Sequence, residues 1–294
     1  MRWPSWEEAA TATAVLGATS LVARQFKGRT PRVVAAFTQE TALISFLYML
    51  WRLAQLPLVQ EEGALDRGRW IWDVQHQMHL PSELTMERWL MHHDTLANWT
   101  VTYYATMHVP SLLLFLLWLW IRHRDQYPRW RDTLAITTGF CLLIRFIRVA
   151  PPRLLPEYGF VDLPAVLGRD IYGPVGTGAS DQFAAMPSIH VAWAAIVGLG
   201  IWSASTSKWR FIGPLHLALT MWAVMATANH WWLDGLVGIG LVGLSWWIDG
   251  AVRTAWARRR PPPGGRDGEA GADTTTDTPS LADLPEAGVA QTNA

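Results

Sequence analysis

Residues 111–121 read Ser-Leu-Leu-Leu-Phe-Leu-Leu-Trp-Leu-Trp-Ile, and this run decides the fold class. It completes an apolar segment that begins near Trp99 and stops sharply at the charged residues 122–125. A helix needs about 20 mostly apolar residues to cross the hydrocarbon core of a bilayer. The segment therefore predicts a membrane-spanning helix over residues 99–121.

The composition of the whole chain agrees with this prediction. The 294 residues are 50% hydrophobic and 16% charged, whereas charged residues make up about a quarter of a typical soluble domain. The aromatic and aliphatic content excludes disorder as the dominant state, and a single cysteine, Cys141, excludes a disulfide framework. The formal net charge of +0, from 24 basic and 24 acidic residues, argues against nucleic acid as the main partner.

Five further apolar segments have suitable lengths, so we expect an all-α fold, a six-transmembrane-helix bundle. Residues 9–23 are too weakly apolar to count as a seventh span. We expect a cytoplasmic N-terminal segment at 1–32, a six-helix membrane domain at 33–257 and a disordered cytoplasmic tail at 258–294, because the tail is rich in Pro, Gly, Asp and Thr. The six expected spans are 33–56, 99–121, 132–149, 188–205, 211–229 and 233–252.

Basic residues set the expected orientation. They are concentrated in the N-terminal segment, in the 122–131 and 206–210 loops and in the C-terminal flank, while the 57–98 and 150–187 loops hold fewer. By the positive-inside rule, both termini lie in the cytoplasm and the 57–98 and 150–187 loops lie outside. We expect an integral protein of a bacterial plasma membrane.

The 57–98 loop is rich in tryptophan, which is typical of an amphipathic segment that lies on the outer leaflet. A metal site is the alternative, because His76, His79, His92 and His93 all fall in this loop. No repeated ligand spacing supports that alternative. The sequence therefore predicts no metal and no other cofactor.

The sequence Met-Pro-Ser-Ile-His at 186–190 leads into the fourth expected span. Pro187 suits the first turn of a helix. Ser188 and His190 would then lie near its outer end, where free backbone amides favour an anion. The alternative is an interfacial histidine that only caps the helix.

A second pair, His230 and Asp234, lies at the same expected depth as His190. A spacing of four puts both side chains on one helix face, and an aspartate there can hold an imidazole in one tautomer and stabilise its cation. The alternative is a structural hydrogen bond at a helix start. Ionisable groups at the membrane are costly, so three that converge on one boundary favour a functional site.

Three arginines accompany the outer end of the third expected span. Arg145 and Arg148 are expected on one face at this end, and Arg153 follows a Pro-Pro pair that ends the helix. They form a candidate phosphate clamp, because guanidinium groups bind phosphate through paired hydrogen bonds. For one of the three, snorkelling to lipid headgroups is the alternative.

These motifs resemble those of the type-2 phosphatidic acid phosphatase superfamily. Residues 187–190 are similar to its Pro-Ser-x-His motif, and His230 with Asp234 is similar to the end of its third motif. The resemblance covers roughly residues 33–252. The chain also resembles one sub-branch of this superfamily, which includes fungal inositol phosphorylceramide synthases and bacterial relatives. The residues that carry this second resemblance are the Pro-Pro-Arg run at 151–153 and Asn98, Tyr103, Tyr104 and His108.

The resemblance implies a role for each of these polar residues. His230, oriented by Asp234, would attack phosphorus and form a phosphohistidine, while His190 would act first as general acid and then as base. Ser188 and the three arginines would bind phosphate oxygens, and no metal would be required.

The sequence departs from the superfamily pattern in the phosphate-binding motifs. The first motif of the superfamily has a lysine, six residues and then Arg-Pro, whereas here Arg145 and Arg153 are eight apart and the prolines come before the second arginine. The arginine that usually lies six residues before the third-motif histidine is replaced by Val224. Arg148 is a candidate for one of the missing cations.

The expected partner is a membrane lipid, either a phospholipid or a diacylglycerol or polyprenyl phosphate. The expected activity is a lipid phosphatase or a phosphoinositol-type headgroup transferase. A transporter or lipid-binding protein without enzymatic activity is the alternative, because intramembrane arginine and histidine also mark transport pathways. The polar residues gather at one face of the membrane and not at its midplane, which favours the enzyme.

Overall fold

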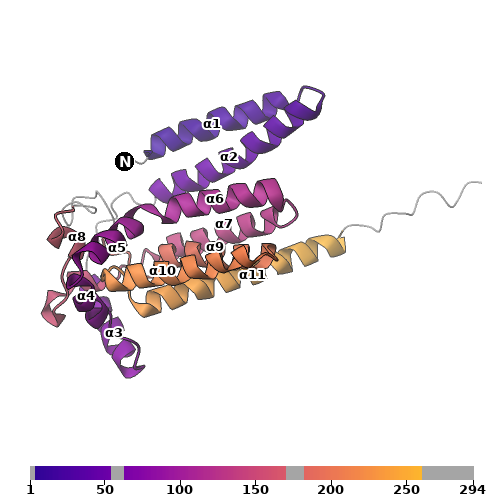
Figure 1. Cartoon of the computed structure of the whole chain (residues 1–294). Helices are drawn as coiled ribbons and strands as arrows, with labels where there is room; N and C mark the ends of the chain where they lie inside the picture. The colour runs from indigo at the N-terminus through magenta and orange to yellow at the C-terminus, as the bar shows by residue number, and fades with distance from the viewer. Residues whose placement is uncertain (1–3, 54–62, 170–181, 260–294) are drawn as a thin grey trace, which may run out of the picture. The chain divides into compact units, whose positions relative to one another are not determined.

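The computed structural model describes residues 4–53, 63–169 and 182–259, and the regular elements in these ranges are helices (Figure 1). The β interaction seen there is an isolated parallel bridge between Val149 and Ala184. The predicted all-α fold class is confirmed. The described helices are α1 (Trp6–Ala23), α2 (Arg29–Leu53), α3 (Ala64–Gln77), α4 (Glu83–Met91), α5 (Asp94–Thr106), α6 (His108–Arg122), α7 (Tyr127–Ile144), η1 (Pro152–Leu154), η2 (Pro156–Tyr158), α8 (Leu163–Val166), α9 (Ile189–Ala204), η3 (Lys208–Phe211), α10 (Ile212–Ala226) and α11 (Trp232–Arg259).

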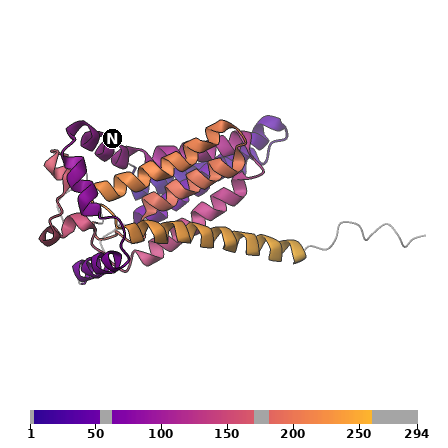
Figure 2. The same cartoon turned by 60° about the horizontal axis from the view of Figure 1, so that its bottom comes forward.

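The described residues up to Val252 form one compact unit, in which α6, α7, α9, α10 and α11 run side by side (Figures 1 and 2). The central element is α9, which contacts α6, α7 and α10. Residues 191–198 of α9 are all buried, as expected for a helix that is apolar on every side. The short helices α3, α4 and α8 gather at the end of the bundle where α9 and α11 begin and α10 ends.

A close glycine contact joins α9 to α10. A Cβ atom on Gly213 would lie 2.5 Å from the carbonyl oxygen of Gly198, which is closer than Cβ contacts in real proteins. Glycine at position 213 therefore lets the two helix backbones touch. Helix α10 packs tightly along α9 and runs back to the end of the bundle at which α9 starts.

The expected span at 99–121 is two helices, α5 and α6, which meet at Met107 and are bent by 54°. The expectation of one continuous helix was therefore wrong. Pro110 explains the break, because its ring would collide with the carbonyl of Thr106 in a continuous helix. Both halves are tied to α10, since His216 Nδ1 lies 2.7 Å from the Tyr103 hydroxyl and His216 Nε2 lies 3.1 Å from Ser111 Oγ.

The third expected span, 132–149, ends five residues earlier than expected, because α7 stops at Ile144. Val149 leaves the helical path and donates its backbone N–H to the carbonyl of Phe183 across 2.7 Å. The Pro-Pro pair at 151–152 also excludes helix in the residues before it. Arg145 is consequently the C-cap of α7 and Arg148 lies beyond the helix, so the two do not share a helix face as expected.

The N-terminal residues form a helix that the sequence reasoning missed. Helix α1 starts with a capping box, in which the Ser5 side chain accepts from Glu8 N–H and the Glu8 side chain accepts from Ser5 N–H. It runs antiparallel to α2 (Figure 1), and Ser20 Oγ donates to the carbonyl of Ala35 across 2.8 Å. The Ser-x-x-Glu pattern at 5–8 was the available signal.

Two of the described helices are long and apolar enough to cross a membrane, namely α11 and the 29–50 stretch of α2. The bent pair of α5 and α6 makes a third if it is one span, and α9 is apolar but shorter. The chain thus has membrane-capable helices, while the count of six spans stays a prediction. The expected tail lies outside the described residues, except that residues 258–259 continue α11.

The described part of the 57–98 segment, the expected outer segment, includes an amphipathic helix, and its place on the outer leaflet stays a prediction. Helix α3 buries one face, formed by Ala64, Gly68, Ile71 and Gln75. The opposite face carries Trp70, which is 63% exposed.

Candidate active site

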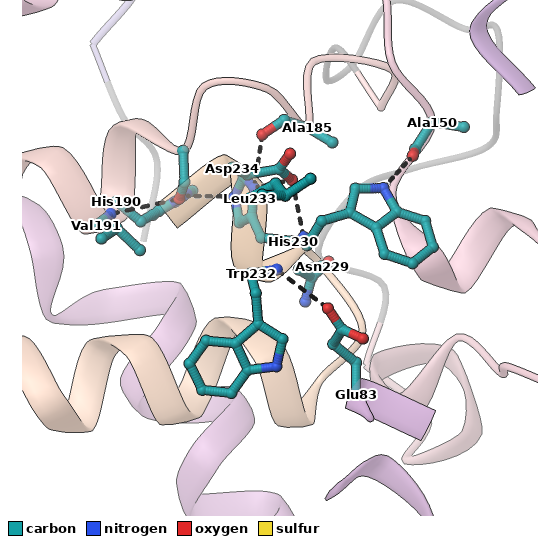
Figure 3. Close-up of polar contacts among 12 residues, drawn as sticks. Glu83, Ala150, Ala185, His190, Val191, Asn229, His230, Trp232, Leu233 and Asp234 are labelled. Carbon is teal, nitrogen blue, oxygen red and sulfur yellow. Dashed lines mark hydrogen bonds and ion pairs between the residues drawn. The ribbon is translucent and has the colours of Figure 1, made fainter. Parts of the chain in front are cut away.

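Two histidines from distant parts of the chain meet at the end of the bundle where α9 and α11 begin (Figure 3). His190 is the second residue of α9, and its Nδ1 atom lies 3.2 Å from Nε2 of His230. His230 is 5% exposed. The structure therefore brings together the two histidines that the sequence singled out.

The hydrogen bonds of His230 define its tautomer. Its Nδ1 atom lies 2.8 Å from the carbonyl oxygen of Ala185 and 3.4 Å from Oδ2 of Asp234, both of which are acceptors. Nδ1 therefore carries a proton, and in the neutral imidazole Nε2 presents its lone pair to His190. A neutral imidazole with a lone pair held in a fixed direction is a nucleophile.

Asp234 orients this imidazole from the first turn of α11. Its Oδ2 accepts the backbone N–H of Trp231 across 2.8 Å, as an acidic residue does at the third position of a helix. Oδ1 is buried and has no hydrogen-bond partner among the described residues. His230 precedes the helix, so the expectation that the pair shares a helix face was wrong. The helix cap brings the two side chains together instead.

Ser188 is fully buried and is the N-cap of α9, where its Oγ accepts from the N–H of Val191 across 3.4 Å. Pro187 therefore lies before the cap and not in the first helical turn as expected. The Ser188 N–H donates to the carbonyl of Asp234 across 3.1 Å, which ties α9 to α11. A Cβ atom on Gly238 would lie 2.8 Å from the Ser188 carbonyl oxygen, so glycine permits this contact.

Arg153 lies beside the turn that carries His230. Its side chain is buried and donates from Nε to Asn229 Oδ1 across 3.1 Å, from Nη1 to Asp162 Oδ2 across 2.9 Å and from Nη2 to Gln182 Oε1 across 3.1 Å. Its backbone N–H also donates to the carbonyl of Ala228. The guanidinium thus holds the residue next to His230 in place.

The other two arginines of the expected clamp lie on the segment that leads to Arg153. Both Arg145 and Arg148 are half-buried and follow the end of α7. The carbonyl of Arg148 accepts a hydrogen bond from Nε of Arg67 in α3. The structure thus places Arg153 directly against the His230 turn and the other two farther back along the chain.

Two aromatic side chains near His190 were not assigned to the site from the sequence. The ring of His108 packs edge-on against His190 at 4.5 Å between centroids, and the ring of Tyr104 lies at 4.9 Å. Both flank the break between α5 and α6. The sequence offered two signals for them: a histidine within an apolar segment and the resemblance of Tyr104 and His108 to a sub-branch of the superfamily.

The metal alternative finds no support in the described ranges, where no three histidine, cysteine or acidic side chains converge to hold an ion. His76, His92 and His93 each direct Nδ1 to the backbone carbonyl four residues earlier. These histidines therefore act locally on their own helices.

Comparison with known proteins gives one family. The sequence pattern of the PAP2 superfamily matches residues 69–248, which is more than half of the chain and includes His190, His230 and Asp234. No curated protein and no solved structure matches. With its apolar helices and a His–His–Asp site inside the matched region, this chain belongs to the PAP2 superfamily.

Proposed function

We propose that this chain is an integral membrane enzyme that transfers a phosphoryl or phosphoester group from a lipid through a phosphohistidine on His230. Membership of the PAP2 superfamily indicates a phosphatase or phosphotransferase, and the apolar helices indicate a membrane protein. The observation that carries the proposal is the lone pair of His230 Nε2, fixed by Ala185 and Asp234 and directed at a second imidazole.

In the first step, Nε2 of His230 attacks phosphorus, so a P–N bond forms while the P–O bond to the leaving group breaks. The leaving oxygen takes a proton from His190, which lies within hydrogen-bond distance of the nucleophile. The positive charge that develops on His230 is balanced by the carboxylate of Asp234.

In the second step, His190 accepts a proton from the incoming hydroxyl group, whose oxygen attacks phosphorus as the P–N bond breaks. Water as the acceptor makes the enzyme a phosphatase for a diacylglycerol or polyprenyl phosphate. A lipid or sugar hydroxyl makes it a headgroup transferase, with phosphoinositol as the proposed group. The reaction is proposed to need no metal ion, so a chelator should leave the rate unchanged.

Phosphate binding is assigned to Arg153, Arg148, Arg145 and Ser188. Cationic guanidinium groups stabilise charge on the phosphoryl oxygens during transfer. Because Arg153 donates to Asn229, Asp162 and Gln182 here, it must exchange at least one of these partners to bind phosphate directly. Its contact with Asn229 supports a role in the site in either case.

The proposed topology has six spans, with both termini in the cytoplasm and the histidines at the outer face. Support comes from basic residues at the far end of the bundle, for example in η3 and after α6. Helix α1 packs along α2 and is not among the described helices that pass as membrane spans. As a seventh span it would move the N-terminus outside, so its placement is open to a direct test.

Phosphate release from lipid phosphates by the purified full-length protein tests the proposed chemistry. Dioleoyl phosphatidic acid in detergent micelles is a suitable substrate, with His230→Ala and His190→Ala as variants and EDTA as an added arm. We expect both variants to lose at least 100-fold in turnover, because each removes a reacting group. Equal rates for the three proteins would instead favour a transporter or lipid-binding protein.

A second experiment separates the two enzyme classes. Phosphatidylinositol is supplied with a ceramide or diacylglycerol acceptor, and the products are separated by chromatography. A new phospholipid identifies a transferase, whereas inositol phosphate released to water identifies a hydrolase.

A further inference from the structure

The first turn of α11 is held by two buried side chains of the 57–98 segment, and Figure 3 shows the contact of one of them, Glu83, with Trp232. Oε1 of Glu83 in α4 accepts the backbone N–H of Trp232 across 3.0 Å. Oε1 of Gln75 in α3 accepts the backbone N–H of Leu233 across 3.0 Å. These contacts bridge 149 and 158 residues of sequence, so they are features of the tertiary fold.

The two side chains also fix each other. Gln75 donates from Nε2 to Oε1 of Glu83 across 2.8 Å, which leaves its own amide oxygen to face Leu233. Gln75 is 3% exposed and Glu83 is 1% exposed. The pair is therefore shielded from water and has a single consistent hydrogen-bond arrangement.

Three successive backbone amides at the start of α11 consequently have side-chain acceptors. Asp234 accepts a hydrogen bond from the N–H of Trp231. Glu83 accepts from the N–H of Trp232, and Gln75 accepts from the N–H of Leu233. The first amides of a helix have no partner within the helix, so outside acceptors decide how firmly the first turn is held. His230 is the residue directly before this turn.

Opposing electrostatic effects act on the carboxyl group of Glu83 at this place. The positive end of the helix dipole favours an anion at the start of α11. Burial raises the pKa of Glu83, and the charge of Asp234 raises it further, while the hydrogen bonds from Trp232 and Gln75 oppose that rise. Both carboxyl groups accept backbone N–H groups from the start of α11, Asp234 from Trp231 and Glu83 from Trp232, so they act on the same helix end.

We propose that Glu83 and Gln75 are positioning residues for His230, which hold the start of α11 so that its imidazole stays aligned with His190 and Asp234. The proposal rests on the proposed function for its catalytic consequence. It assigns a catalytic purpose to two residues of the 57–98 segment.

The test uses the full-length protein with four variants. Glu83→Ala removes the acceptor for Trp232, and Gln75→Leu removes the acceptor for Leu233 at similar volume. Glu83→Gln keeps an amide oxygen that can accept from Trp232. Glu87→Gln is the matched control, because Glu87 is a buried carboxyl of the same helix whose Oε2 accepts from Val161 and not from α11.

Two quantities are measured for each variant: steady-state kinetics of phosphate release from phosphatidic acid, and amide hydrogen exchange of the peptide that covers residues 230–236. We expect Glu83→Ala and Gln75→Leu to lower kcat by about 10- to 100-fold with KM within about twofold, because misplacement of a reacting group by about 1 Å has effects of this size. Their exchange over 230–236 should rise, while Glu83→Gln and Glu87→Gln should stay within about threefold of the unaltered protein in kcat.

Three results would overturn the proposal. One is unchanged exchange in both Glu83→Ala and Gln75→Leu, and another is unchanged kcat despite faster exchange. The third is an equal loss of kcat in Glu87→Gln, which would show a general response of α4 to altered buried carboxyls. If the unaltered protein releases no more phosphate than His230→Ala while exchange still responds, the cap is supported and the proposed function alone fails.

Discussion

Nε of Arg153 donates a hydrogen bond to Oδ1 of Asn229 across 3.1 Å, so a buried cation is bound to the residue directly before His230. Lysine cannot reproduce three hydrogen bonds from one planar group. We expect Arg153→Lys to lower phosphate release from phosphatidic acid by about 10-fold or more. Arg153→Ala should also lower stability by about 3 kcal/mol, because it leaves Asp162 without its cation.

The matched control for Arg153 is Arg169→Lys. Arg169 donates to Thr102 Oγ1 across 2.5 Å in an exposed contact. Its turnover and melting temperature should match those of the unaltered protein. If Arg153→Lys behaves in the same way, Arg153 has no part in the site.

Asp234→Asn separates the charge of this residue from its capping role. The amide oxygen can still accept from Trp231, so α11 should keep its first turn. The carbonyl of Ala185 continues to hold Nδ1–H of His230, so the tautomer should survive. We therefore expect a kcat loss of about 10- to 100-fold, smaller than for a site in which the carboxylate alone fixes the tautomer. Single-turnover phosphate release measures it, and an unaltered rate would show that the negative charge is dispensable.

We expect the free energy of unfolding to depend on pH because of Glu87. Burial raises the pKa of this α4 carboxyl to about 7, from an ordinary value of 4.5. The folded state therefore holds its proton more tightly than the unfolded state. The resulting stabilisation is complete below about pH 4.5 and is lost as the pH rises through about 7, by an amount on the order of 3 kcal/mol.

Melting temperatures in detergent between pH 5 and pH 8 measure this effect. We expect the melting temperature of the unaltered protein to fall over this interval, and that of Glu87→Gln to fall less because glutamine does not titrate. Parallel curves for the two proteins would show that Glu87 is not the group responsible.

Cysteine labelling tests the topology, because the native Cys141 is buried. Met78→Cys lies in the outer segment and Thr206→Cys lies between α9 and η3, both at exposed positions. We expect a membrane-impermeant maleimide applied to intact cells to label position 78 and not position 206. An N-terminal tag should be inaccessible from outside, and its detection there would make α1 a span.

Much of the fold was predictable from local sequence. The start of α9 at Ser188 and the turn before α11 follow from a capping residue and from a short polar break between apolar runs. The early end of α7 was not predictable from local sequence, because it depends on the pairing of Val149 with a segment more than 30 residues away. Helix propensities of single residues do not predict such a long-range contact.

The candidate site shows the same division. His190, His230 and Asp234 were identifiable because costly ionisable groups recur at one expected depth. Glu83 and Gln75 could not be identified from the sequence, because their partners are backbone amides in a helix far along the chain. A side chain that binds backbone leaves no complementary residue in the sequence by which to recognise it.

The contact between Gly238 and Ser188 has a consequence for how this site can vary. His190 lies in α9 and His230 lies before α11, and main-chain atoms set their spacing. The N–H of Ser188 donates to the carbonyl of Asp234, and Gly238 has no Cβ atom beside this contact. A single methyl group at position 238 would separate the helices at their starts. Glycine at position 238, a residue with no side chain, is thus required for the close approach of α9 and α11 at the candidate site.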